Sequence, residues 1–254
     1  MAWNKSGSHR SSTPAGASVP QHRIVRNAWA IAAFFGASLC PRAEAGFACG
    51  EGFGGVSDLP AHGWSLRNNS QPLGTTDWYQ GNPSVFPAWV GAPNSYVAAD
   101  GNNAAGSTAI VSNWLITPDI DFGPNEFNIR FFQFYTRALP GAANRMVVRL
   151  CLQTPTEYCD APGPLAGDIG GYDTILLDIN PDLALDGYPD IWTEYFLTPA
   201  DGLPVVGHGR IAFHYYLPTQ PGGDHGSYIG IDAVTMAGAT VCPFTDVLLE
   251  NGFD

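Results

Sequence analysis

The chain has 254 residues, of which 45% are hydrophobic, and its formal net charge is −12. The 209 residues that follow Ala45 contain 6 arginines, no lysine and 22 acidic residues, which gives this part a formal charge of −16. A nucleic acid or an anionic membrane needs basic side chains opposite its phosphates, so this balance argues against both as partners.

The N-terminal segment has the pattern of an export signal. A basic stretch at residues 22–26 precedes an apolar run at residues 28–39, which is too short to cross a bilayer. Ala43-Glu44-Ala45 then matches the A-x-A pattern of a signal peptidase site. We therefore expect residues 1–45 to be a cleaved signal peptide. The protein is expected to be secreted or held at the cell surface, with no membrane insertion after cleavage.

Residues 46–241 are predicted to form one all-β domain, followed by a short tail over residues 242–254. The segment is rich in Gly, Pro, Asn and aromatic residues, and short apolar runs alternate with turn residues. Residues 145–153 alternate as a strand with one wet face does, whereas residues 127–136 are apolar on both faces, as in a central strand. Further strands are expected at residues 109–117, 174–179, 192–198, 210–217 and 227–236. Seven or more short strands favour a β-sandwich.

Four cysteines follow the expected leader, and an even number in an exported chain predicts two disulfides. Three pairings are possible. We favour Cys151 with Cys159, which closes a short loop between strands, and Cys49 with Cys242, which ties the ends of the domain together. No C-x-x-C spacing is present, so a zinc site is a poor alternative.

The common catalytic signatures are missing from the sequence. It contains no G-x-S-x-G, no H-E-x-x-H, no P-loop and no G-x-G-x-x-G after a strand, so we expect no catalytic residues and a protein that is not an enzyme. The histidines that follow the leader are scattered, and surface or structural roles are expected for them. They are His62, His208, His214 and His225.

One acidic segment resembles the start of an EF-hand calcium loop. Asp178, Asn180 and Asp182 have the right spacing, but the sixth position is Leu183 and the twelfth is Pro189. Because an EF-hand needs Gly and Glu at those positions, a plain connection between strands is favoured.

Asp232 is the more informative carboxylate. The apolar positions of its strand change parity between Ile231 and Val234, which predicts a β-bulge that redirects the Asp232 side chain. Paired with Glu51 of the first strand, Asp232 could hold a structural calcium ion. The equally open alternative is an aspartate hydrogen-bonded to the backbone at an exposed bulge.

The segment at residues 56–103 carries many aromatic residues among Pro, Asn and Gly. Trp78, Tyr79 and Trp89 are candidates for stacking on sugar rings in a binding cleft, since flat apolar rings beside hydrogen-bonding groups suit a pyranose. The alternative is that these tryptophans are buried in the core, as most are.

Several motifs resemble the choice-of-anchor J family, which is related to the cleaved adhesin domains of bacterial surface proteases and to MAM domains. They are the opening EGFGGVSDLPAHGW, the segment SNWLITPDIDFG at residues 112–123, and the closing pair GRIAFHYYLPT and GSYIGIDAVTM. The resemblance implies a jelly-roll sandwich of the MAM-like or concanavalin-like kind, exported and without enzymatic activity. Gly54 stands where many relatives carry Glu, so the calcium prediction depends on Glu51. The terminal NGFD resembles the acidic tails of some exported Gram-negative proteins.

Together these features predict a non-catalytic module that binds an extracellular glycan or protein. One alternative is a hydrolase that uses two carboxylates about 5 to 10 Å apart on a jelly-roll scaffold. Another is a purely structural accessory domain.

Overall fold

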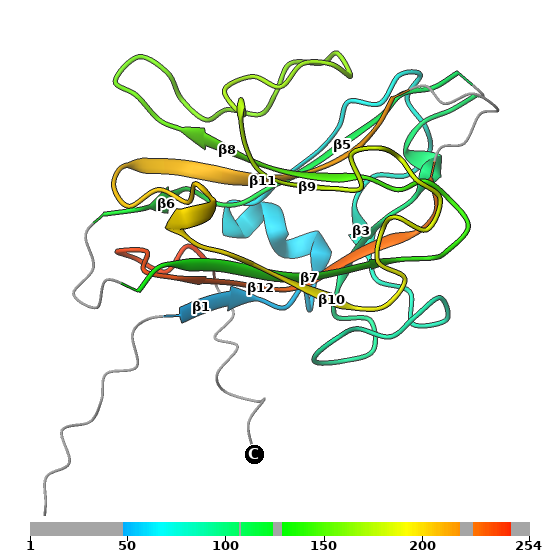
Figure 1. Ribbon diagram of the computed structural model, residues 1–254, viewed down its shortest axis with the longest axis horizontal. Helices are drawn as coiled ribbons and strands as arrows, with labels where there is room; N and C mark the ends of the chain where they lie inside the picture. The colour runs from blue at the N-terminus through cyan, green and yellow to red at the C-terminus, as the bar shows by residue number, and fades with distance from the viewer. Residues whose placement is uncertain (1–47, 107, 124–128, 219–225, 245–254) are drawn as a thin grey trace, which may run out of the picture. The chain divides into compact units, whose positions relative to one another are not determined.

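Two antiparallel β-sheets face one another and enclose the main hydrophobic core (Figure 1). The computed structural model describes residues 48–106, 108–123, 129–218 and 226–244. The predicted signal peptide, His225 and the chain after residue 244 lie outside these ranges. Among the residues that are described, no helix is long and apolar enough to span a membrane.

Sheet A has six strands among the residues that the structure describes. Its order is β10 (Thr193–Leu197), β7 (Phe131–Ala138), β12 (Ile229–Ala237), β4 (Val97–Ala99) and β3 (Tyr79–Gln80), and β1 (Ala48–Glu51) also pairs with β12. The strand β12 is therefore central, because it pairs with β7 along one side and with β4 and β1 along the other.

Sheet B also has six strands within the described ranges. Its order is β2 (Ser65–Asn68), β5 (Val111–Ile116), β11 (His208–Leu217), β8 (Met146–Leu152) and β9 (Thr174–Ile179), and β6 (Ile120–Asp121) pairs with β11. Strands that neighbour one another in a sheet are mostly distant in sequence, because the chain crosses repeatedly between the sheets, as in a jelly roll. The predicted all-β sandwich is confirmed.

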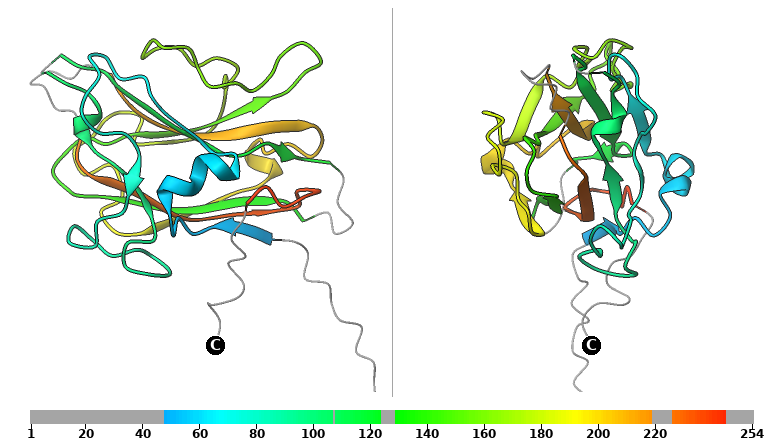
Figure 2. Two further views of the ribbon diagram at one scale, coloured as in Figure 1. Left: turned by 180° about the vertical axis from the view of Figure 1, so that it is seen from behind. Right: turned by 90° about the vertical axis from the view of Figure 1, so that its right-hand side faces the viewer.

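Short 3-10 helices connect some of the strands. They are η1 (Val56–His62), η2 (Gly101–Asn103) and η3 (Pro199–Asp201). Figure 2 shows η1, in cyan, beside the two sheets. It buries Val56 and Leu59 in the core, and the adjacent Trp64 packs edge-on against Phe53 with 5.6 Å between ring centroids. This helix closes one side of the sandwich.

The predicted strand at residues 145–153 is β8, whose residues Met146, Val148 and Leu150 face the core. The expectation that its other face is wet is wrong, because Val147 and Cys151 on that face are buried. The prediction for residues 127–136 needs correction, because the strand that is described there, β7, buries only alternate residues. Phe132 and Phe134 point into the core, while the intervening side chains stay partly exposed on the outside of sheet A. The outer face of β7 is therefore partly exposed, although it carries aromatic residues.

Both disulfides join the predicted partners. Cys49 of β1 is bonded to Cys242, with 5.6 Å between their Cα atoms, and links the two ends of the described domain. Cys151 is bonded to Cys159 with a Cα separation of 5.7 Å. This second pair packs with Trp114 and Tyr172 in a small cluster on the outside of sheet B, which holds the loop after β8 against that face.

Candidate functional site

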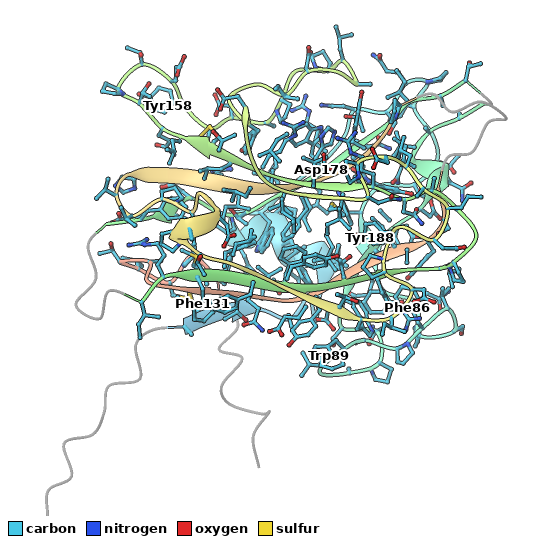
Figure 3. The ribbon with its side chains drawn as sticks, viewed as in Figure 1. Phe86, Trp89, Phe131, Tyr158, Asp178 and Tyr188 are labelled. Carbon is cyan, nitrogen blue, oxygen red and sulfur yellow. A yellow bond between two sulfur atoms is a disulfide. The ribbon has the colours of Figure 1, made fainter. Side chains whose placement is uncertain are left out.

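The outer side of sheet A carries an exposed set of aromatic and hydrogen-bonding side chains, which we call the aromatic face. It consists of Trp89, Phe131, Gln133, Tyr135, Glu194 and Phe196. Phe131, Gln133 and Tyr135 alternate with the buried residues of β7 and so point away from the core. Figure 3 shows Trp89 on this same side, in the loop beneath sheet A.

The four rings form two stacked pairs. Trp89 lies over Tyr135 with 4.8 Å between centroids and 20° between planes, and Trp89 is 52% exposed. Phe131 stacks on Phe196 of the neighbouring β10, again with centroids 4.8 Å apart, and Phe196 is 50% exposed. Since Phe131 and Tyr135 are four residues apart on one strand, the two pairs are separated by about 13 Å.

A polar pair fills the space between the two stacks. The amide nitrogen Nε2 of Gln133 donates a hydrogen bond to the Oε1 atom of Glu194 on β10. Burial, followed by the nearby Glu194 carboxylate, raises the pKa of the Tyr135 hydroxyl, so this phenol stays neutral. The face therefore alternates apolar rings with hydrogen-bonding groups.

The loop that bears Trp89 is supported by a second aromatic cluster. Phe86 packs against Tyr96 at 5.2 Å and edge-on against Trp192 at 5.5 Å. The indole nitrogen of Trp192 donates to the carbonyl of Pro87 at 2.9 Å. The guanidinium of Arg137 lies 4.2 Å from the centre of the Phe86 ring. These contacts hold the loop in place next to β7.

Asp232 holds the other end of this loop. Its Oδ2 atom accepts hydrogen bonds from the backbone N–H groups of Trp89 at 2.7 Å and Val90 at 3.2 Å, and Oδ1 accepts one from Ala233 at 2.7 Å. The predicted bulge is present, since the β7–β12 register shifts between Asp232 and Thr235 and Ala233 has a φ of 49°. The side chain is fully buried, so the expectation of an exposed bulge is corrected. Burial raises the pKa of Asp232 to about 7.

Glu51 and Asp232 face opposite sides of sheet A. Glu51 is the register partner of Val234, which belongs to the core between the sheets, and its Oε1 atom accepts the N–H of Phe53 at 2.8 Å. Asp232 reaches the outer loop instead. Within the described ranges no three His, Cys, Asp or Glu residues gather as a metal site. The structure thus does not bring the two proposed ligands together, and structural calcium stays a prediction.

Of the three residues predicted to contact a ligand, only Trp89 is exposed at a surface. Trp78 is 4% exposed and belongs to the core between the sheets, which corrects its assignment, because a buried ring cannot stack on a sugar. Tyr79 is half-buried, and its hydroxyl donates to Asp100 Oδ2 at 3.0 Å. The other rings of the aromatic face were not predicted as ligand contacts, because their pairing depends on the strand register.

The EF-hand-like segment is a connection between strands, as favoured. Asp178 receives two hydrogen bonds from Arg145, at 2.9 and 2.7 Å, so its carboxylate is already neutralised. Asn180 adopts a φ of 61°, and its side chain binds both the N–H and the carbonyl of Ala184. This is the geometry of a turn closed by an asparagine.

The described histidines have surface or structural positions. His62 ends η1 and His208 begins β11, and both are exposed. His214 is buried and stacks on Trp114 with 3.7 Å between ring centroids. Burial, and then the positive charges of Arg149 and Arg145, lower the pKa of His214 well below its usual value, so the ring is neutral.

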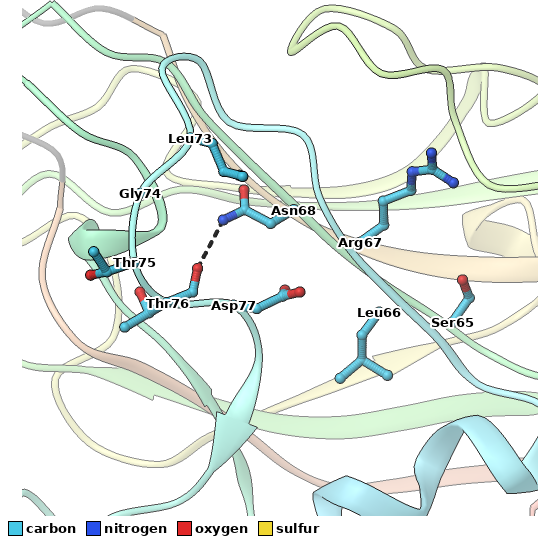
Figure 4. Close-up of a pocket in the computed structure, with 9 residues that line it drawn as sticks. All are labelled: Ser65, Leu66, Arg67, Asn68, Leu73, Gly74, Thr75, Thr76 and Asp77. Carbon is cyan, nitrogen blue, oxygen red and sulfur yellow. Dashed lines mark hydrogen bonds between the residues drawn. The ribbon is translucent and has the colours of Figure 1, made fainter.

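A hollow of about 460 Å³ lies along β2, at the edge of sheet B (Figure 4). Asn68 reaches across it and donates to the carbonyls of Thr76 at 2.9 Å and Asn103 at 2.8 Å. The Thr76 hydroxyl is itself bonded to Asp100 at 2.7 Å. These polar groups already hold the adjoining segments together, so the aromatic face is the stronger candidate site.

Comparisons with known proteins give only distant likenesses. No family model matches the chain, and no curated protein matches it. Among solved structures, it is similar to the K1 cleaved adhesin domain of Lys-gingipain from Porphyromonas gingivalis, with 22% identity over 75% of this chain and 98% of that one and a TM-score of 0.47. It is also similar to a family 11 carbohydrate-binding module from Clostridium thermocellum, with 13% identity over 75% and 97% of the two chains and a TM-score of 0.38.

Likenesses at these TM-scores establish neither a family nor a ligand for this chain. The assignment to the choice-of-anchor J family stays a prediction.

Proposed function

We propose that this protein is a non-catalytic, extracellular binding module that attaches to a glycan through the aromatic face. The observation that carries the proposal is the pair of ring stacks, Trp89 on Tyr135 and Phe131 on Phe196, on either side of a hydrogen-bonding pair. Large rings that are about half exposed and grouped on one face are typical of interaction surfaces.

The chemistry of the face suits a sugar chain. The C–H face of a pyranose packs on aromatic rings, while its hydroxyls need donors and acceptors such as Gln133 and Glu194. Because the two stacks lie about 13 Å apart along β7, an oligosaccharide can contact both, whereas a single sugar cannot. An extended polysaccharide is therefore favoured over a monosaccharide.

The negative charge of the protein limits which glycans can bind to this face. Glu194 stands at its centre, and the chain after Ala45 has a formal charge of −16, so a polyanion would be repelled. A neutral polysaccharide avoids this cost. Two disulfides further support a location outside the cell, where oxidising conditions preserve them.

The test is isothermal titration with soluble xylan, mannan and β-glucan, using the wild-type protein and the variants Trp89→Ala and Phe196→Ala. We expect at least one neutral polysaccharide to bind and each variant to weaken it about tenfold, since each removes one stacked ring. Tyr158→Ala is the matched control. Tyr158 is 71% exposed on the loop outside sheet B, so its loss should leave binding unchanged (Figure 3).

Two results would overturn this proposal. If none of the polysaccharides binds, or if Tyr158→Ala weakens binding as much as Trp89→Ala does, the aromatic face is not the site. If new reducing ends appear during incubation with any of the polysaccharides, the protein is a hydrolase and the non-catalytic assignment is wrong.

A further inference from the structure

The outer side of sheet B carries most of the positive charge that follows Ala45. Four of the six arginines after Ala45 lie there, namely Arg67, Arg145, Arg149 and Arg210. Arg149 pairs in register with Ala212, and Arg67 with Trp114. Ala212 and Trp114 belong to the cluster outside sheet B, and residues that pair directly share a face.

Arg145 has its own counter-charge on this surface. Its guanidinium is bonded through two nitrogens to the carboxylate of Asp178, which Figure 3 places on the side of sheet B that faces away from sheet A. Such a two-bond pair fixes the plane of the guanidinium. Asp178 also partly offsets the lowering of the pKa at Arg149, but its ion pair is with Arg145.

Arg149 lies beside this pair without an acidic partner among the described residues. Its Nη1 donates to the carbonyl of Tyr172 at 3.1 Å, while its buried Nε has no acceptor. Burial and then the charge of Arg145 lower the pKa of Arg149. A half-buried cation is costly when it has lost water and gained no ion pair in return, as is the case for Arg149 among the described residues.

An aromatic ring lies next to these cations. The Tyr216 ring is half-buried, its centroid is 5.8 Å from the Arg145 guanidinium carbon, and it packs on His214 with 4.9 Å between centroids. His214 is neutral, so it neither supplies nor competes for charge. The surface thus combines an unsatisfied guanidinium with a ring.

We propose that Arg149, together with Tyr216 and the fixed Arg145, forms a second binding site that takes the carboxylate of an acidic sugar. The Nε of Arg149 is buried, so the two Nη atoms are the ones that can meet the oxygens of a carboxylate, and the Tyr216 ring can pack on the sugar to which that carboxylate is attached. The high negative charge of the whole chain selects against densely charged polymers, so the fitting ligand carries isolated uronate groups. The site lies on the opposite sheet from the aromatic face and does not depend on it.

The experiment compares methyl glucuronide with methyl glucoside, which differ only by a carboxylate in place of a hydroxymethyl group. Each is titrated into ¹⁵N-labelled protein while the arginine Nε–Hε and Tyr216 ring resonances are followed by NMR. We expect the glucuronide to shift the signals of Arg149 and Tyr216 and the glucoside to leave them in place. Arg149→Gln should weaken glucuronide binding at least about tenfold, since it removes a charged hydrogen-bonding group.

Two further variants separate a specific site from general attraction. Arg67→Gln removes one exposed positive charge from the same side of sheet B and should retain glucuronide binding. Arg149→Lys keeps the charge without the fork and should still weaken binding. The thermal midpoint of each variant shows whether it is folded. The NMR shifts of the wild-type protein on addition of glucuronide test the site without any substitution.

The proposal is overturned if the two sugars cause equal shifts or if the glucuronide does not shift Arg149. It is also overturned if Arg67→Gln and Arg149→Gln, both folded, lose binding equally. Trp89→Ala distinguishes the two sites, since it should weaken binding of neutral polysaccharide about tenfold and leave the glucuronide shifts unchanged.

Discussion

The buried carboxylate of Asp232 should make the stability of this protein fall as the pH rises through the neutral range. Asp232 has a pKa of about 7 in the folded protein, against an ordinary value of 3.8 for an aspartate. Its pKa is raised because burial penalises the charged form more than the N–H groups of Trp89, Val90 and Ala233 favour it. Between these two pKa values, the folded state keeps the proton and the unfolded state has released it.

The sign and size of the effect follow from proton linkage. Below pH 4 both states are protonated at this group, and the group gives no pH dependence. From pH 4 to 7 only the folded state holds the proton, so the free energy of unfolding falls by about 1.4 kcal/mol per pH unit, or about 4 kcal/mol in all. Above pH 7 both states are ionised and the contribution is again constant. The stabilisation is thus present at acidic pH and lost as the pH rises toward 7.

The assay is urea unfolding, followed by tryptophan fluorescence, of the wild-type protein and Asp232→Asn at several pH values from 4 to 8. Asparagine has nearly the same shape and does not titrate, so contributions from all other groups cancel in the difference. As the pH rises from 4 to 7, the free energy of unfolding of the variant should increase by about 4 kcal/mol relative to that of the wild type, and this difference should stay constant above pH 7. The reasoning is refuted if the free energy of unfolding changes with pH in the same way in both proteins. That result would mean that the three N–H donors keep Asp232 ionised in the folded protein.

Removal of each disulfide and one glycine substitution test the covalent links and the packing. In the chain-entropy model, alanine substitution of the Cys151–Cys159 disulfide, with a sequence separation of 8, should cost about 2.5 kcal/mol of unfolding free energy, measured by urea unfolding. The same change at Cys49–Cys242, with a separation of 193, should cost about 5 kcal/mol, and the opposite order would contradict the model. A Cβ at Gly81 would overlap the Tyr96 ring, so Gly81→Ala should lower stability by about 1 to 3 kcal/mol in the same assay. Gly167→Ala is the control, since its Cβ would meet nothing within 4 Å.

The sequence predicts those parts of the fold that depend on neighbours along the chain. Alternation identified β8, and the change of parity after Ile231 identified the bulge at Asp232. The cysteine pairs followed from loop length and from the position of the ends. Each of these inferences needs only the period of a strand or the length of a loop, which the order of residues contains.

The site depends on contacts that the order of residues does not contain. Phe131 and Phe196 are 65 positions apart and meet only because β7 and β10 pair in one particular register. Conversely, Trp78 and Trp89 stand in the same aromatic-rich segment, yet one is in the core and the other on the surface. Composition cannot distinguish them, because the same ring suits both places. The role proposed for Arg149 likewise depends on a spatial contact, because Asp178 forms its ion pair with Arg145, and Arg149 has no ion pair among the described residues.

The sandwich separates the two proposed binding sites. The aromatic face is the outer side of sheet A and Arg149 is on the outer side of sheet B, so the packed core lies between them. Because the sheets of a sandwich pack about 10 Å apart and both sites point outward, a stiff polysaccharide lying along one face cannot reach the other. In the double variant Trp89→Ala/Arg149→Gln, the affinity for neutral polysaccharide and the affinity for glucuronide should each fall by the same factor as in the single variant, since separated sites do not share partners. A module of this kind would join two different glycan strands, one neutral and one carrying uronate groups, rather than bind a single strand twice.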